Sequence, residues 1–186
     1  VRWLAVYAFL MGAGVAAVNA YLPLYAVEVL GVSVQLAGAV AAIIGFVGIL
    51  SRVLWGWLTE RGGGFVVPLL VMAVGAVVAL GLVIAAQLAG TAVLWLAALV
   101  FGATAVTWNA VGMLALVTEV DPADAGRASG HVLLGFYGGF VPSPIVFGAI
   151  VDATGDYRVA WAGVAAVFVA AALLMSAWRR LPGLGE

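Results

Sequence analysis

"GGGFVVPLLVMAVGAVVALGLVIAAQLAGTAVLWLAALVFGATAVTWNAVGMLALVT", residues 62–118, is the stretch that decides the fold, because its 57 residues include no charged side chain. A helix that crosses a membrane needs about 20 predominantly apolar residues. The stretch is therefore long enough for two spans. Gln87, Gly90 and Thr91 interrupt its apolar character near the middle and mark the expected break between them.

Charged residues divide the rest of the chain into four shorter uncharged blocks. These lie between Arg2 and Glu28 (25 residues), Glu28 and Arg52 (23), Arg127 and Asp152 (24), and Arg158 and Arg179 (20). Each block holds one span. The sequence thus predicts six transmembrane helices, at 3–29, 34–58, 65–86, 91–118, 125–151 and 157–178. Alternation typical of membrane strands is not seen, so we expect an all-α membrane protein folded as a six-helix bundle.

The composition agrees with this class. The 186 residues are 67% hydrophobic and 8% charged, with a mean hydropathy of +1.27, whereas soluble domains have about 25% charged residues. The absence of cysteine excludes disulfides and thiolate chemistry. A net charge of −1 provides no basic field for a nucleic acid.

Arginine predicts the orientation. With six spans, both termini lie on one side of the membrane. That side also holds Arg2, Arg52, Arg61, Arg127, Arg179 and Arg180, and only Arg158 falls on the other side. Because positive charge stays in the cytoplasm, we expect both termini there and a bacterial-type inner membrane as the location.

An internal repeat is indicated at an offset of 90 residues. "MGAGVAAVNAYLPLYAV" (11–27) and "FGATAVTWNAVGMLALV" (101–117) share six residues in register, and "GFVG" (45–48) aligns with "GFYG" (135–138). Two residues later in register, "GWLTE" (56–60) parallels "GAIVD" (148–152). Transporters often consist of inverted three-helix units. We therefore expect a single domain over 1–186, with repeat units at about 1–88 and 89–180 and a cytoplasmic tail at 181–186.

"GWLTERGG" (56–63) resembles the loop signature of the major facilitator superfamily, Gly-x-Leu-x-Asp-Arg-x-Gly followed by two basic residues. Gly56, Leu58, Arg61 and Gly63 match, Glu60 replaces the aspartate, and Gly64 and Phe65 stand where the basic pair belongs. "EVDPADAGRASG" (119–130) and "FGAIVDATGDYRVAW" (147–161) are similar to the segments that precede helices 11 and 12 of that family. The resemblance implies the C-terminal half, helices 7 to 12, of a protein about twice as long.

The resemblance also implies a function, which is transport of a small organic solute by alternating access between two six-helix halves. The implied partners are the solute, the lipid bilayer, and either the missing first half or a second copy of this chain. In the family the first helix of each three-helix unit lines the central cavity, and here those helices carry Asn19 and Asn109.

Four residues are candidates for substrate binding. Asn19 and Asn109 are the only asparagines. Each lies about ten residues from a helix end and hence near the midplane, where a polar side chain needs a partner or a water-filled path. The alternative is a helix–helix hydrogen bond, worth about 0.6 kcal/mol. Trp108 is a candidate cavity wall or a core residue. Tyr137 lies at mid-depth, where its hydroxyl needs a partner.

Five residues are candidates for a conformational gate: Arg52, Gly56, Glu60, Arg61 and Arg127. The predicted helices place the signature in a cytoplasmic turn, away from the cavity. We hypothesise that Glu60 pairs with Arg127 or Arg52 and stabilises one state of the carrier, the alternative being a solvated turn. Exposed pairs contribute only about 0–1 kcal/mol, which is enough to bias a balanced equilibrium.

The segment "GGFVPSP" (138–144) predicts a deformable helix, because two glycines and two prolines lie at membrane depth. There the hydroxyl of Ser143 is expected to bond to a carbonyl that proline leaves free.

The sequence favours a protein that is not an enzyme. Ser129 and His131 are close in sequence but point about 200° apart on a helix, and no metal-binding cluster or cofactor motif occurs. The remaining alternatives are a non-transporting membrane scaffold and a half-size carrier that works as a homodimer.

Overall fold

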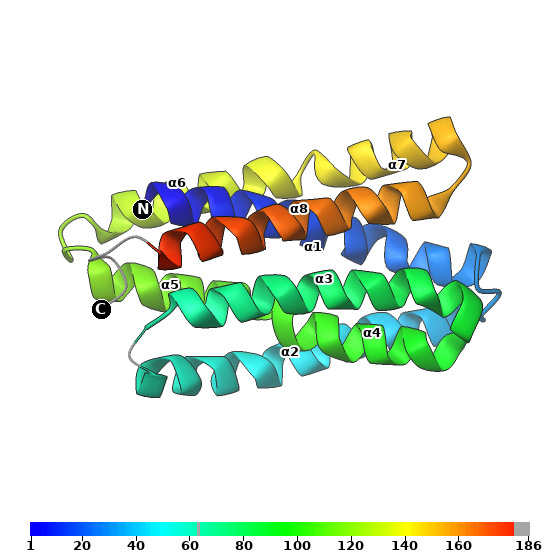
Figure 1. Ribbon diagram of the computed structural model, residues 1–186, viewed down its shortest axis with the longest axis horizontal. Coiled ribbons are helices and arrows are strands. Elements are labelled where there is room, and N and C mark those ends of the chain that lie inside the picture. Colours follow the sequence, from blue (N-terminus) through cyan, green and yellow to red (C-terminus); the bar gives the residue numbers. More distant parts are fainter. Residues whose placement is uncertain (63, 181–186) are drawn as a thin grey trace.

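The computed structural model describes residues 1–62 and 64–180, which contain helices and no strand (Figure 1). Single helices form four of the spans: α1 (Arg2–Glu28), α2 (Val34–Gly62), α3 (Val66–Ala89) and α8 (Tyr157–Arg179). The other two are interrupted: α4 (Thr91–Thr104), the 3₁₀ turn η1 (Ala105–Thr107) and α5 (Trp108–Glu119) form one, and α6 (Ala125–Phe140) and α7 (Ser143–Thr154) the other. All six are long and apolar enough to cross a membrane, which confirms the predicted class. The expected tail at 181–186 lies outside the described residues.

The end of α2 differs from the prediction. The signature was expected in a turn after residue 58, but α2 continues to Gly62, so Glu60 and Arg61 lie on its last turn. Thr59, one residue past the predicted end, is buried, and its hydroxyl bonds to the Trp55 carbonyl of the same helix at 2.7 Å. The inward face of the helix therefore continues past Leu58. Gly63, which completes the signature, lies outside the described residues.

The fourth span was predicted to be continuous, and η1 interrupts it. The Thr104 hydroxyl donates to the Val100 carbonyl at 2.6 Å, and the Thr107 hydroxyl is 3.0 Å from the Thr104 carbonyl. Hydroxyls of this kind compete with the backbone ladder and bend helices. The carbonyl of Ala103 also accepts a hydrogen bond from the Trp55 indole at 2.7 Å, which links this point to α2.

The fifth span breaks where its glycines and prolines predicted deformation. Between α6 and α7 the chain leaves the helix at Val141 and Pro142. The Ser143 hydroxyl donates at 2.6 Å to the carbonyl of Ala13 on α1. The expected partner was a freed carbonyl of the same helix. Instead the serine joins two helices.

The helices pack so that α1 contacts α6 and α8 most, while α4 contacts α3 and α2 (Figure 1). Two buried tyrosines tie α1 to α3, because Tyr7 donates to the Leu69 carbonyl at 2.8 Å and Tyr25 to the Val83 carbonyl at 3.2 Å. Since α3 and α8 also pack together, they form the layer against which α1 is anchored.

Equivalent positions of the predicted repeat make equivalent close approaches. A Cβ added to Gly12 would stand 2.5 Å from the Phe136 carbonyl oxygen on α6, and one added to Gly102 would stand 2.7 Å from the Ile44 carbonyl oxygen on α2. Small residues allow membrane helices to approach this closely. Each glycine belongs to the first span of its unit and touches the second span of the other unit, an arrangement that supports the inverted repeat.

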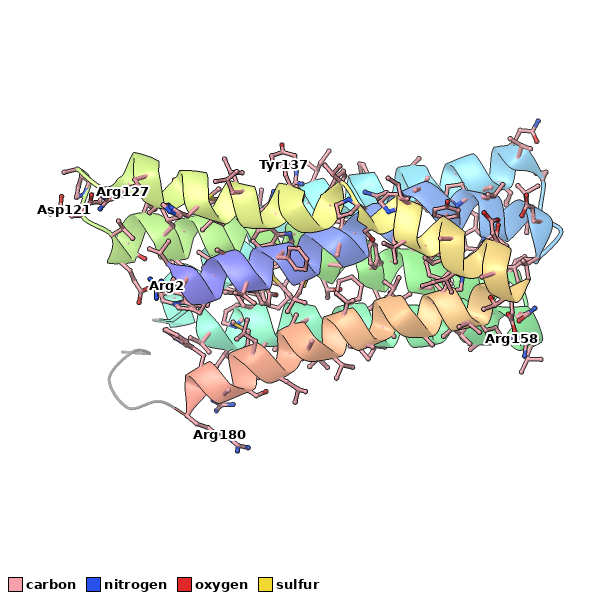
Figure 2. The ribbon with its side chains drawn as sticks, turned by 90° about the horizontal axis from the view of Figure 1, so that it is seen from above. Arg2, Asp121, Arg127, Tyr137, Arg158 and Arg180 are labelled. Atoms are coloured by element: carbon pink, nitrogen blue, oxygen red, sulfur yellow. The ribbon has the colours of Figure 1, made fainter. Side chains whose placement is uncertain are left out.

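Both ends of the described chain lie at the same end of the bundle. Figure 2 shows Arg2, Arg127 and Arg180 at that end and Arg158 at the opposite one. These three arginines therefore lie at the end of the bundle opposite Arg158, as the sequence predicted.

Candidate functional site

Asn19 and Asn109 lie on two different helices, on opposite sides of the middle of the bundle. Asn19 is nine residues before the end of α1 at Glu28, and Asn109 is ten before the end of α5 at Glu119. At 1.5 Å per residue these separations are about 14 and 15 Å. Glu28 and Glu119 lie at opposite ends of the bundle, so the structure places the two amides about 6 Å to either side of the middle of their spans.

Both asparagines are exposed, and among the described residues neither amide has a hydrogen-bond partner. Asn19 is about 120° around α1 from Tyr25, which bonds to α3. Asn109 is roughly 140° around its span from Thr104, whose side chain stands against Gly75 of α3. The two amides are thus turned away from the α3 layer, and the alternative of a helix–helix bond within this bundle is not realised in the described structure.

Tyr137 points away from the bundle (Figure 2) and is 55% exposed. Its ring contacts Phe136 and Phe140 on α6, with ring centroids 5.1 and 6.4 Å away. Among the described residues its hydroxyl has no hydrogen-bond partner. Tyr137 therefore offers a phenol, at a surface that the described residues leave open.

Trp108 is a packing residue in this bundle, which corresponds to the second of its two interpretations, a core residue. It is 5% exposed, with its ring 5.9 Å from that of Tyr7 and 5.8 Å from that of Phe136. The indole therefore fills the space between α1 and α6. The sequence does not predict the burial of Trp108. Residues 108 and 109 are neighbours, but they point about 100° apart on a helix and so face different surroundings.

The gate candidates do not come together as hypothesised. Arg127 bonds to Asp124 at 2.9 Å, and among the described residues Glu60 forms no ion pair. Arg52 is eight residues before Glu60 on the same helix, about 12 Å along its axis, which is too far for a direct contact. The guanidinium of Arg61 lies 3.8 Å from the ring centre of Trp57.

Arg52 and Gly56 lie in the second half of α2. Arg52 is exposed and ten residues, about 15 Å, from the end of α2 at Gly62. Nothing lies within 4 Å of the point where a Cβ on Gly56 would stand. Gly56 therefore makes no close contact with another helix of this bundle. A close contact at Gly56 would need a partner from outside the bundle.

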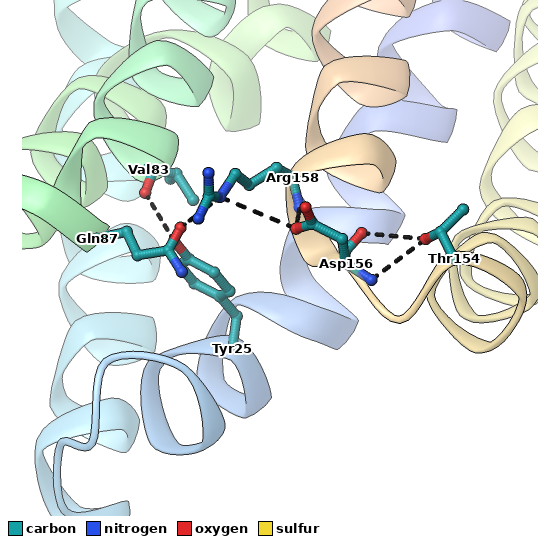
Figure 3. A network of polar contacts seen from close by, with 6 residues as sticks. All are labelled: Tyr25, Val83, Gln87, Thr154, Asp156 and Arg158. Atoms are coloured by element: carbon teal, nitrogen blue, oxygen red, sulfur yellow. Dashed lines mark hydrogen bonds and ion pairs between the residues drawn. The ribbon is translucent and has the colours of Figure 1, made fainter.

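A polar network at the opposite end was not predicted (Figure 3). Arg158 on α8 donates through Nε to the Gln87 side chain on α3 at 2.8 Å, and the Asp156 carboxylate caps α8 by accepting from the Arg158 amide at 2.8 Å. Nearby, Tyr157 donates to Glu28 of α1 at 2.8 Å. Long-range pairing of this kind has no signature in the sequence, because Tyr157 and Glu28 are 129 residues apart.

The described residues include no group of three or more metal-ligating side chains. His131 uses Nδ1 in a 2.7 Å contact with the Arg127 carbonyl, so it is a helix-surface residue held one turn from its partner. The functional groups at the candidate site are therefore two amides and a phenol, which donate and accept hydrogen bonds.

Comparison with known proteins gives both a family and a fold. The family model for the Major Facilitator Superfamily matches residues 1–130. Among solved structures, the peptide transporter POT in complex with sulfate superposes with a TM-score of 0.84 and 18% identity, over 96% of this chain and 37% of that one. The POT family transporter PepTSo superposes with a TM-score of 0.79 and 13% identity, over 96% and 37%.

A mutant of the first transporter in complex with alafosfalin also matches, with a TM-score of 0.84, 17% identity, and coverage of 96% of this chain and 38% of that one. No curated protein sequence matches the chain. At these identities the solved structures show a common fold. The chain spans 37–38% of the length of the transporters that it matches.

Proposed function

The chain belongs to the major facilitator superfamily, and from this premise we propose that it is the C-terminal half of a secondary transporter that moves a small organic solute by alternating access. A complete carrier of this type has two six-helix halves that rock about a site near the bilayer midplane. This chain supplies one set of six spans. The peptide transporters share its fold over little more than a third of their length, which agrees with a part of such a carrier.

The observation that carries the proposal is the position of Asn19 and Asn109. An amide in hydrocarbon without a hydrogen-bond partner is costly, so exposed polar side chains at the midplane indicate a face covered by protein or water. Both asparagines lie on the first span of a three-helix unit and turn away from α3. We propose that they line the solute path and that Tyr137 of α6 adds a third polar group.

The solute proposed is neutral or singly charged. Amides and a phenol recognise hydrogen-bonding groups rather than a high charge. The peptide specificity of the matched transporters is not transferred to this chain, because 13–18% identity supports the fold alone.

The proposed location is a bacterial-type inner membrane with the end that holds Arg2, Arg127 and Arg180 in the cytoplasm. Five of the seven arginines, Arg2, Arg61, Arg127, Arg179 and Arg180, lie at helix ends on that side, and Arg52 lies about 15 Å along α2 from it. The positive-inside rule counts charges of this kind near helix ends.

Transport by an assembled carrier tests the proposal. The chain would be produced with the sequence encoded directly upstream of it, purified, and screened against a library of small solutes for thermal stabilisation. A ligand at 100 times its Kd stabilises by about 2.7 kcal/mol. A solute that stabilises the assembly would then be tested for uptake into proteoliposomes, with Asn19→Ala and Asn109→Ala as variants.

The expected result is uptake by the assembly, loss of uptake in both variants, and no uptake by the chain as a monomer. Uptake by the chain alone in a dimeric form would contradict the half-carrier and favour a half-size homodimer. If the assembly transports nothing that it binds, the scaffold alternative replaces the proposal.

A further inference from the structure

The helices α2 and α3 follow one another in sequence yet share almost no contacts, and they run apart at the end that holds both termini (Figure 1). Between them lies a cavity of about 530 Å³. Its lining includes Trp55 and Leu58 of α2, Val67, Pro68 and Val71 of α3, and Arg179 from the end of α8. A volume of this size lies within the range of about 300–1,000 Å³ that ligand pockets occupy.

The depth of this cavity corresponds to the cytoplasmic headgroup boundary. A hydrocarbon core of 30 Å takes about 20 helical residues. The cavity lining includes Val66, the first residue of α3, and Arg179, the last residue of α8, so the cavity lies at the terminal turns of both helices. Trp178 beside Arg179 packs against Trp3 with ring centroids 4.6 Å apart and the rings tilted by 31°, and tryptophans are enriched at the membrane–water interface.

The positive charge at this cavity indicates an anionic ligand. Arg179 lines it, Arg180 follows directly, and among the described residues neither forms an ion pair. Glu60 lies on the same stretch of α2 but does not line the cavity. Apolar walls below a cationic rim match the acyl chain and phosphate of an anionic phospholipid, and basic pockets between helices on the cytoplasmic side bind such headgroups.

The repeat provides an internal comparison. At an offset of 92 residues, Trp55 and Leu58 correspond to Phe147 and Ile150, which line a second cavity between α7 and α8. That cavity is smaller, about 160 Å³, and no arginine lines it. Equivalent grooves therefore occur in both units, and only the one at the arginine-rich end carries a cation.

We propose that the groove between α2 and α3 binds one anionic phospholipid of the cytoplasmic leaflet, with the phosphate at Arg179 and an acyl chain along Leu58 and Val71. The bound lipid fills the space that the two helices leave open and couples α2 to α3 and α8. This proposal rests on the orientation proposed above, with both termini in the cytoplasm, but not on the proposed solute or on a second half.

Native mass spectrometry of the purified, delipidated chain tests it, with dioleoyl-phosphatidylglycerol and dioleoyl-phosphatidylcholine as probes. We expect one phosphatidylglycerol to be retained with an affinity about fivefold or more above that of phosphatidylcholine. Arg179→Gln should remove this preference, and Arg158→Gln, at the opposite end, should leave it. Glycerol phosphate added as the headgroup alone should not displace the lipid.

A second pair of variants tests the acyl path. Val71→Phe should lower the retention of both lipids, whereas Val78→Phe, on the same face of α3 but outside the cavity and similarly exposed (50% against 46%), should not. Equal retention of the two lipids by the unmodified chain would overturn the proposal. So would an equal effect of the two arginine variants, or of the two valine variants, or displacement by glycerol phosphate.

Discussion

At the scale of residues, the sequence predicted depth better than direction. The uncharged blocks place Asn19 and Asn109 within the spans, and the structure has each about 6 Å from the middle of its span, because depth depends only on helix rise. Direction depends on which neighbour each side of a helix meets. Trp108 is buried against Tyr7 although Asn109 beside it is exposed. No pattern of a single sequence contains that information.

A single hydroxyl provides a test at this scale. Ser143→Ala removes the bond to the Ala13 carbonyl, one of the direct polar links between α7 and α1. We expect the free energy of unfolding to fall by about 0.6 kcal/mol, and by no more than about 1.7, as found for hydrogen bonds between membrane helices.

Denaturant titration in mixed micelles measures this change. Ser176→Ala is the matched control, since that hydroxyl bonds only to the Ala172 carbonyl of its own helix. A larger loss in the control than in Ser143→Ala would show that the contact with Ala13 does not join the helices.

At the scale of elements, the spacing of charged residues predicted every span. The predicted helix ends and breaks are wrong where side-chain contacts, and not charge spacing, decide them. The predicted end of α2 is four residues short, at 58 instead of 62, because the buried Thr59 continues the packed face. The break at Val141 and Pro142 followed from proline and glycine chemistry. The break at η1 did not, because threonine is common in unbroken membrane helices and only the Trp55 contact distinguishes this site.

Substitutions at two closely packed glycines test how these helices pack against one another. Gly12→Val and Gly102→Val each place a side chain against a backbone carbonyl of the neighbouring helix, at 2.5 and 2.7 Å from the added Cβ. Backbone cannot give way as a flexible side chain does. We expect each variant to lose about 1–3 kcal/mol of stability or more.

Thermal unfolding followed by size-exclusion chromatography measures the loss. Gly45→Val is the control, because nothing lies within 4 Å of its added Cβ. The two variants should be destabilised by similar amounts, since the repeat places them equivalently. A neutral result for one of them would contradict that equivalence.

At the scale of the whole molecule, the bundle leaves two kinds of surface open. Most of it is apolar and suits lipid. The part that carries Asn19 and Asn109 is polar at the midplane, where lipid is a poor partner. In the carrier proposed above, this part lines a solute path that one six-helix half completes only against another half. The first span of each unit carries the polar groups, as the family resemblance implied.

The central claim is that Asn19 and Asn109 face a water-accessible path in the assembled carrier. Cysteine labelling measures this directly, and this chain adds no background because it contains no cysteine. Asn19→Cys, Asn109→Cys and Val169→Cys would be treated with a membrane-impermeant maleimide in vesicles of both orientations. Val169 is 40% exposed at a similar depth on α8 and serves as the lipid-facing control. We predict that both asparagine positions react and position 169 does not; asparagine positions as unreactive as position 169 would contradict the account.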